Sequence, residues 1–454
     1  MEQTHKPYPI VFVTGVGQTW TSLKGDHTHR WNLFARDKEI IFGALTAAQR
    51  MQLLRAVPQM TRALLTGKPA DQTALREAVT TLLRFCYVDD DGRLPDCTDV
   101  HIYGARSFDE LGRVDFYTGE ETHDSSRTLL DRLLRDVPCR DFLDSFGAEN
   151  MYCFNYSPFT DLYAAADALH ETLRAITHKR GQDKVVLVPM SMGAAVTLAY
   201  LDAYYTEDGA AEENYIDSIV SVVGAWDGSE GFADLLLGDV CAQWNDVIYK
   251  ELLPKQKLPK PLLHLLTRNP ARTNALLRQL LYALLDGILM RSSAFLALVP
   301  HARWDEMFPY LFAEARFRQN SRLHTVRRDT HRFLRAQENL RRRMRDIHDT
   351  CGVRFSFVGG TGLKPGEESS DFDFMRYFRC ADRTDTDGVL QITSSMPFDM
   401  DAPESYVHAF AVYDRQMHEI GGNAQAMRLI FALAAGEAVD TSGTLRAYIA
   451  PDEA

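Results

Sequence analysis

The segment VVLVPMSMGAAVTLAYL, residues 185–201, places a lone serine between two apolar stretches of different character. Residues 185–188 are valine and leucine, which is typical of a strand buried on both faces of a parallel sheet. Residues 194–204 are rich in good helix formers and predict a helix. Ser191 is therefore expected in a sharp turn between a buried strand and a helix.

A serine in this position has two interpretations. It is a buried residue of an ordinary strand-to-helix turn, or it is the nucleophile of an elbow of the form G-x-S-x-G. The chain has Pro-Met-Ser-Met-Gly, which keeps Gly193 but lacks the first glycine. An elbow holds the hydroxyl beside a helix N-terminus, where backbone N–H groups can stabilise an oxyanion. The second interpretation requires a base and an acid elsewhere in the chain.

Composition indicates a globular protein without obvious nucleic-acid or metal chemistry. The 454 residues, 45% of them hydrophobic, suffice for one large core with an insertion or for two domains. A formal net charge of −12 argues against a nucleic-acid surface and gives no general attraction to anionic membranes. The seven cysteines are scattered without a CxxC pair or a Cys/His cluster, so we expect reduced thiols and no metal or other cofactor.

No targeting or membrane-spanning segment is expected. The opening MEQTHKPYPIVFVTG lacks the basic region, long apolar core and cleavage site of a signal peptide. The most apolar stretch, residues 275–299, is interrupted by charged residues and a glycine, so it predicts no transmembrane helix. We therefore expect a cytoplasmic protein.

Strand-like and helical segments alternate along the chain, which predicts an α/β fold with a mainly parallel sheet and helices on both faces. The helical stripe Leu162, Ala165, Leu169, Leu173 and Ile176 stands between two strands and leads into Ser191 as a βαβ unit. The candidate strands are residues 10–14, 152–156, 185–188, 219–223, 353–358 and 406–412.

Two long segments interrupt this alternation. We expect a core in two parts, residues 1–227 with an insertion at about 37–139, and residues 351–454, separated by a helical cap at 228–350. In the first insertion, VDDDGRLPD resembles a calcium loop, but the ligand positions would fall on Tyr87 and Thr98, so a turn between short strands is favoured. Late in the cap, residues 331–349 predict an amphipathic helix with a solvated basic side. A transient lipid-surface contact by this basic side is the alternative.

A serine nucleophile needs a base and a carboxylate, which follow it in the order acid then histidine in a sheet of this kind. Asp387 precedes a glycine in a tight turn after the strand at 353–358, with Asp385 as its competitor. His418 lies in a loop after the last predicted core strand, where a reachable base belongs. His408 lies inside that strand and is expected to be structural.

The loop after the first strand, VTGVGQ, is expected to supply the second oxyanion donor. The backbone N–H of Met192 and one from Val16 or Gly17 are the candidates. A phosphate-binding interpretation is disfavoured because the third glycine and a GK[ST] pattern are absent.

These segments resemble the lecithin:cholesterol acyltransferase family of α/β-hydrolases, which includes lysosomal phospholipase/transacylases. The similarity spans nearly the whole chain and rests on eight segments in the same order. This chain departs from the family at the elbow and in the second segment, which is similar to the family's YDWR segment but lacks its tryptophan and arginine. The eight segments are PIVFVTGVGQ, CFNYSPFTDLYAAADALHETLRAI, VVLVPMSMGAAVTLAYL, YIDSIVSVVGAWDGS, ARWDEMFPYLF, GVRFSFVGGTG, TDGVLQITSS and HEIGGNAQAMRLI. The resemblance implies an α/β-hydrolase fold and a triad of Ser191, Asp387 and His418.

The sequence thus predicts a serine acyl hydrolase or acyltransferase for lipid or other carboxylic esters, with no nucleic-acid partner. Trp226 and the cap residues Leu280 and Leu284 are expected to contact substrate, although the leucines could instead pack cap helices against one another. The alternative function is an inactive protein of the same fold that binds a lipid or a protein partner.

Overall fold

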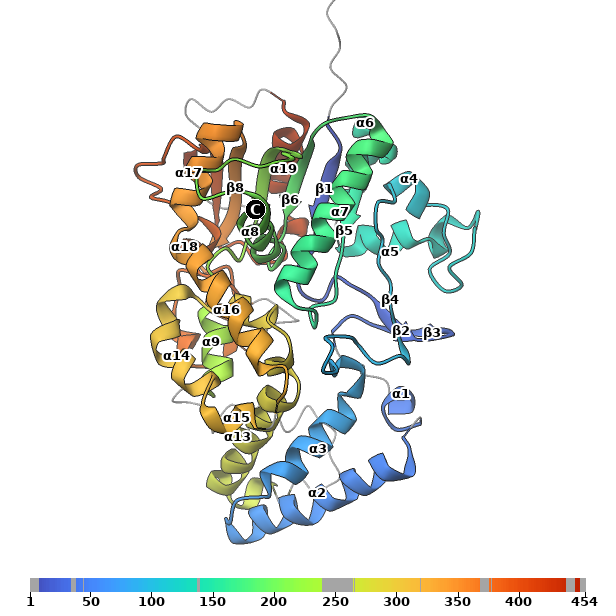
Figure 1. Ribbon diagram of the computed structural model, residues 1–454, viewed down its shortest axis with the longest axis vertical. Coiled ribbons are helices and arrows are strands. Elements are labelled where there is room, and N and C mark those ends of the chain that lie inside the picture. The colour runs from blue at the N-terminus through green and yellow to red at the C-terminus, as the bar shows by residue number, and fades with distance from the viewer. Residues whose placement is uncertain are drawn as a thin grey trace, which may run out of the picture.

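The computed structural model describes residues 8–33, 38–43, 45–136, 139–238, 264, 266–318, 320–367, 375–376, 378–437 and 446–449. Its centre is a seven-stranded sheet in the order β10-β9-β8-β7-β6-β1-β5, in which every pairing is parallel (Figure 1). The strands are β1 (Ile10–Val13), β5 (Met151–Phe154), β6 (Val185–Pro189), β7 (Ile216–Val222), β8 (Arg354–Thr361), β9 (Val407–Asp414) and β10 (Arg446–Ile449). All six strands expected from the sequence are present, whereas β10 was not anticipated.

Helices cover both faces of this sheet, as expected for a buried parallel sheet. The alternation along β1 sends Val11 and Val13 into one hydrophobic cluster and Ile10 and Phe12 into the other. The first cluster includes side chains of α7 (Leu162–Arg180), α8 (Gly193–Tyr204), α16 (Leu323–Glu338) and α17 (Leu340–Cys351). The second includes side chains of α4 (Phe108–Leu111), α5 (Leu129–Asp136), α6 (Arg140–Phe146) and α19 (Ala424–Ala435).

The amphipathic helices lie as their patterns predicted. In α7 the whole expected stripe is buried, and the helix ends where Gly181 takes the left-handed conformation (φ 61°). The arginine-rich segment forms two helices that meet at Asn339 rather than one continuous helix. Its apolar side chains Phe333, Leu340, Met344 and Ile347 are buried in the main core, so the amphipathic stripe faces the protein.

A separate helical layer lies below the sheet in the view of Figure 1. There α2 (Ala47–Thr66) and α3 (Gln72–Leu82), from the first insertion, pack against α13 (Pro270–Gly287), from the second. The segment 228–350 therefore spans both layers, because α16 and α17 pack on the core while α13 packs against α2 and α3.

The remaining described elements are short. A three-stranded antiparallel sheet contains β2 (Thr21–Leu23), β3 (Asp26–Trp31) and β4 (Thr98–Val100). The other helices are α1 (Lys38–Gly43), α9 (Glu230–Leu237), α14 (Trp304–Leu311), α15 (Glu314–Phe317) and α18 (Ile392–Ser395). Among the described residues, no helix combines the length and apolar character needed to cross a membrane.

The acidic segment at residues 89–93 forms a turn. Asp89 Oδ1 accepts the backbone N–H groups of Asp91 and Arg93, and Gly92 has a φ of 84°. The element before it is the 3₁₀ helix Arg84–Cys86 rather than the expected short strand. In the described part of the chain no group of three or more His, Cys, Asp or Glu residues is arranged to hold a metal, and the six described cysteines form no disulfide with one another.

Candidate active site

Ser191 occupies a strained turn at the carboxyl end of the sheet. Strand β6 ends at Pro189 and α8 begins at Gly193, so the turn is only three residues long. The φ of Ser191 is 50°, in the left-handed region that residues other than glycine rarely adopt. Such strain costs of order 1–3 kcal/mol and persists where surrounding structure enforces it. Here the Ser191 N–H donates to the Val222 carbonyl at 3.1 Å, and its carbonyl accepts the Ala225 N–H at 2.9 Å.

Two glycines allow the backbone to crowd around the serine. A Cβ on Gly193 would overlap the carbonyl oxygen of Val13 in β1, which explains why this half of the elbow pattern is kept. A Cβ on Gly15 would lie 2.9 Å from the Ser191 Cβ, closer than real Cβ atoms approach. The loop after β1 therefore lies directly against the serine.

Ser191, His418 and Asp387 form a continuous hydrogen-bonded chain. His418 Nε2 is 2.9 Å from Ser191 Oγ, and His418 Nδ1 is 2.8 Å from Asp387 Oδ2. The second carboxylate oxygen of Asp387 accepts the N–H groups of Val389 at 2.9 Å and Leu390 at 2.7 Å. The His418 N–H also donates to the Asp387 carbonyl at 2.9 Å, which ties the two loops together. Such an arrangement can activate the hydroxyl, orient the imidazole and stabilise its protonated form.

The surroundings of His418 favour a basic imidazole. Burial alone would lower the pKa of His418, but the charge and hydrogen bond of Asp387 outweigh this effect and raise the pKa above its usual value. Asp387 is completely buried and the His418 residue is 7% exposed, so little solvent screens this pair.

The two competing residues lie elsewhere. Asp385 is partly exposed and accepts two hydrogen bonds from Arg383, at 2.9 and 2.8 Å, which lower the pKa of its carboxyl group. His408 lies in β9 as expected, but its side chain is exposed rather than enclosed by the core. The structure therefore brings Asp387, and not Asp385, to the imidazole of His418.

Of the predicted oxyanion donors, Met192 is next to Ser191 in the chain, and Val16 and Gly17 belong to the loop whose Gly15 lies against the serine. Met192 follows the serine directly and precedes the first residue of α8, so its N–H is at the helix N-terminus. In the loop after β1, Gly15 donates its N–H to Gln18 Oε1 at 2.6 Å, which closes the loop on itself. The N–H groups of Met192, Val16 and Gly17 donate to no carbonyl of the described residues. They are thus the groups that could meet an oxyanion formed at Ser191.

The residues predicted to contact substrate are completely or partly buried in the protein. Trp226 is completely buried and donates its indole N–H to Ser221 Oγ at 2.8 Å, so its ring belongs to the core. Leu280 is partly buried in the helical layer of α2, α3 and α13, and Leu284 is partly buried against the main core. The structure thus favours the alternative in which these leucines pack helices together.

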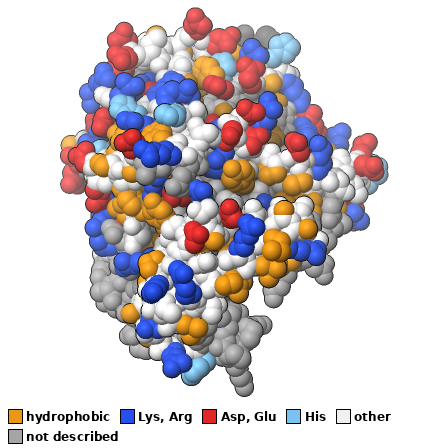
Figure 2. Space-filling view, turned by 60° about the horizontal axis from the view of Figure 1, so that its bottom comes forward, with side chains coloured by type: hydrophobic (Ala, Val, Ile, Leu, Met, Phe, Trp, Pro, Cys, Tyr) orange, Lys and Arg blue, Asp and Glu red, His pale blue; other side chains and the backbone are white. Residues whose placement is uncertain are grey.

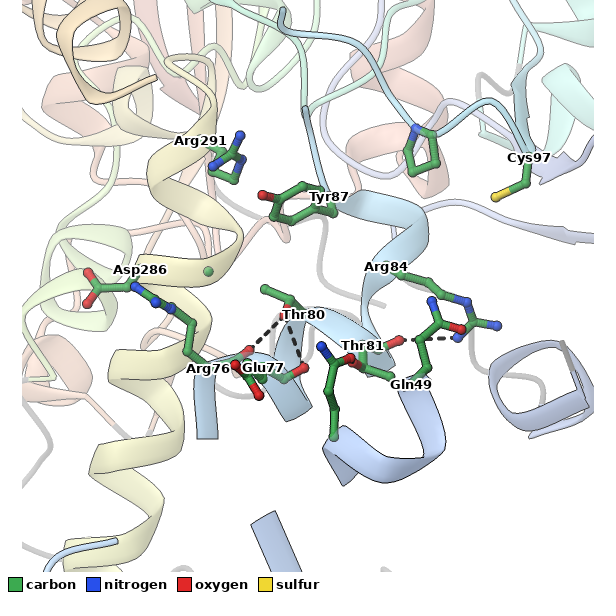
Figure 3. A pocket seen from close by; sticks show the side chains of 13 residues that line it. Gln49, Arg76, Glu77, Thr80, Thr81, Arg84, Tyr87, Cys97, Asp286 and Arg291 are labelled. Atoms are coloured by element: carbon green, nitrogen blue, oxygen red, sulfur yellow. Dashed lines mark hydrogen bonds between the residues drawn. The ribbon is translucent and has the colours of Figure 1, made fainter. Parts of the chain in front are cut away.

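A cavity of about 440 Å³ lies in the helical layer between α2, α3 and α13. Figure 3 shows side chains that line it, and Ser191, Asp387 and His418 are not among its lining residues. Its arginines are engaged by the protein. Arg84 donates to the carbonyls of Ile41 and Thr81, and Arg291 donates to Asp90 and to the Val88 carbonyl.

Sequence reasoning missed the polar residues that hold the Asp387 turn. Ser229, fully buried after β7, donates its hydroxyl to the Val389 carbonyl at 2.7 Å. Nearby, Gln391 Oε1 accepts the Glu230 N–H at 3.1 Å. The sequence does place a small polar residue after β7, the strand next to β6, near the edge where the parallel strands end. Many loops have such residues, so this position alone does not identify Ser229.

Comparison with known proteins adds little to this geometry. No protein-family model matches the chain, and no curated protein matches it. Fourteen chains among the solved structures resemble it. One belongs to "The crystal structure of Tle4-Tli4 complex", with 13% identity, 95% of this chain and 98% of that chain covered, and a TM-score of 0.37. A similarity at this level does not bear on function.

Proposed function

We propose that this protein is a serine acyl hydrolase or acyltransferase of the α/β-hydrolase fold that acts on carboxylic esters, including lipid esters. The observation that carries the proposal is the unbroken hydrogen-bond chain from Ser191 Oγ through His418 to Asp387. Supporting it, the nucleophile follows a central parallel strand, and the acid and the base follow it in chain order. The resemblance to the lecithin:cholesterol acyltransferase family supports the lipid part of the proposal.

In the proposed reaction, Ser191 Oγ attacks the ester carbonyl carbon while His418 Nε2 takes the hydroxyl proton. The resulting oxyanion accepts hydrogen bonds from the N–H of Met192 and from that of Val16 or Gly17. The tetrahedral intermediate collapses to an acyl-enzyme as His418 returns the proton to the departing alcohol. Water or an alcohol acceptor then attacks the acyl-enzyme, and His418 again acts as base. The chemistry requires no metal or organic cofactor.

A fluorophosphonate probe tests this proposal because it labels an activated serine well. We expect the wild-type protein to be labelled on the peptide that contains Ser191, and Ser191→Ala to remain unlabelled. Ser126, an exposed residue of the 3₁₀ helix Ser125–Arg127, provides a matched control, since Ser126→Ala should be labelled as the wild type is. If the folded wild-type protein is not labelled, the alternative function is favoured, an inactive protein of the same fold that binds a lipid or a protein partner. A label on another serine would mean that this other serine is the nucleophile.

Ser229 is predicted to position the catalytic acid rather than to react. Its hydroxyl holds the Val389 carbonyl, and the N–H of Val389 holds Asp387 Oδ1. Ser229→Ala removes one buried hydrogen bond and should lower kcat by roughly twofold to tenfold, in line with about 0.5–1.5 kcal/mol, while KM changes little. Ser229→Thr keeps the hydroxyl and is expected to restore part of the loss.

A purely structural role would give a different pattern. Thermal stability would then fall in Ser229→Ala, but kcat measured well below the melting temperature would match the wild-type value. That result would contradict a positioning role.

A further inference from the structure

Exposed apolar side chains are concentrated at one end of the molecule. Among the described residues, seven large hydrophobic side chains are exposed, and five of them lie between residues 42 and 65. They are Phe42 (50%), Met51 (51%), Leu54 (61%), Val57 (56%) and Leu65 (53%). Figure 2, in which this end comes forward, shows hydrophobic and basic side chains next to one another. Clustered exposure of this kind marks an interaction surface more often than scattered apolar residues do.

The geometry of α2 gathers these side chains on one face. Leu54, Pro58 and Leu65 follow Met51 by three, seven and fourteen residues, so they share one stripe of the helix, with Val57 beside it. The opposite side of the helix already packs in the protein, because Ala56 and Ala63 are buried there and Met60 packs in the same cluster as Ala63, with residues of α3 and α13. Helix α2 is thus apolar on two sides, and folding requires only the inner one.

Charge distinguishes this face from the rest of the protein. Residues 45–70 contain no Asp or Glu, in a chain whose formal net charge is −12. They do contain four basic residues, Arg50, Arg55, Arg62 and Lys68, all of which are exposed. On the helical wheel, Arg50 lies at the edge near Val57, while Arg55 and Arg62 lie at the opposite edge beyond Met51. An apolar strip with cations at both edges complements an anionic lipid surface, because the cations can reach headgroups while the apolar side chains enter the acyl boundary.

We propose that the outer face of α2 docks the protein on an anionic lipid surface. The helix lies along the surface, since its inner side stays packed on α3 and α13. The inference goes beyond the proposed function, because docking requires no turnover. The two are compatible, since docking would concentrate the enzyme where lipid esters are found.

Co-sedimentation with vesicles tests the docking directly. The full chain carrying Ser191→Ala is used, so that hydrolysis cannot alter the lipids and the result does not depend on whether the protein is an esterase. We expect binding to vesicles of equal parts phosphatidylglycerol and phosphatidylcholine, several-fold weaker binding to pure phosphatidylcholine, and a fall in binding as salt rises.

Matched double variants separate the docking face from general hydrophobicity. Leu54→Gln with Val57→Gln should weaken vesicle binding by roughly tenfold or more, because each buried methylene contributes to insertion. Ile102→Gln with Met400→Gln removes two exposed apolar side chains elsewhere (45% and 37% exposed) and should leave binding unchanged. Arg55→Gln with Arg62→Gln should remove much of the preference for anionic lipid. When the same substitutions are made in the protein that retains Ser191, each variant should hydrolyse a short soluble ester at the wild-type rate.

Two outcomes would overturn the proposal. Equal vesicle binding by Leu54→Gln with Val57→Gln and by Ile102→Gln with Met400→Gln would mean that α2 is not the contact. Analytical ultracentrifugation that gives a dimer for the wild type and a monomer for Leu54→Gln with Val57→Gln, without vesicle binding by either, would make this face a contact between copies of the chain. Loss of esterase activity in every protein tested would instead count against the proposed function and leave the vesicle result standing.

Discussion

Replacing Ser191 with alanine is expected to lower kcat for ester hydrolysis by at least about a thousandfold, and by up to roughly a millionfold. The hydroxyl is the atom that attacks in the proposed mechanism, and it lies 2.9 Å from the base that would activate it. His418→Ala should cause a loss of similar size, because an unactivated serine hydroxyl is a poor nucleophile near neutral pH. The measurement is kcat for a soluble ester with each purified variant.

The double variant Ser191→Ala with His418→Ala tests whether the two residues act in the same step. If Ser191 and His418 act in one step, the second substitution should add almost nothing to the first, since the oxyanion donors alone account for the residual rate. Additive losses would mean that the two residues serve different steps. Ser191→Ala retains the Cβ and the backbone bonds to Val222 and Ala225, so its melting temperature should stay near the wild-type value.

Local patterns in the sequence account for much of the fold. Runs of buried β-branched residues mark the central strands, and the stripe of α7 marks the helix that leads toward Ser191. Such signals are strong because one segment carries the whole pattern. The break at Asn339 between α16 and α17 has no comparable signal, because the apolar period continues through it and no proline or glycine interrupts the chain there.

Features set by tertiary packing could not be predicted in the same way. The leucines of α13 are compatible in sequence both with contact to substrate and with helix packing, and only the position of α2 and α3 against them favours packing. The exposed face of α2 was likewise hidden in the sequence, because its stripe looks the same whether it meets the core or solvent. The choice between Asp385 and Asp387 also rested on two residues of the same type only two positions apart.

Asp387→Asn is the variant that tests this last choice, and it should lower kcat by roughly ten-thousandfold. In the wild type, one carboxylate oxygen accepts the N–H groups of Val389 and Leu390 and the other meets His418 Nδ1. An asparagine that keeps its oxygen on those two N–H groups would turn its NH₂ group toward the imidazole. His418 would then accept at Nδ1 and carry its proton on Nε2, where it could no longer take the proton of Ser191.

Asp385→Asn should change kcat by no more than a few-fold, because that side chain pairs with Arg383 at a partly exposed site. The pH dependence of kcat/KM provides a second readout. Since Asp387 raises the pKa of His418 and the neutral imidazole is the active form, activity in the wild type should fall as the pH drops through a value above 6.5. In Asp387→Asn, the pH at which the residual activity falls should move to a lower value, because the carboxylate charge that raises the pKa of His418 is gone. If Asp385→Asn caused the larger loss and the larger shift of the acid limb, the catalytic acid would be Asp385.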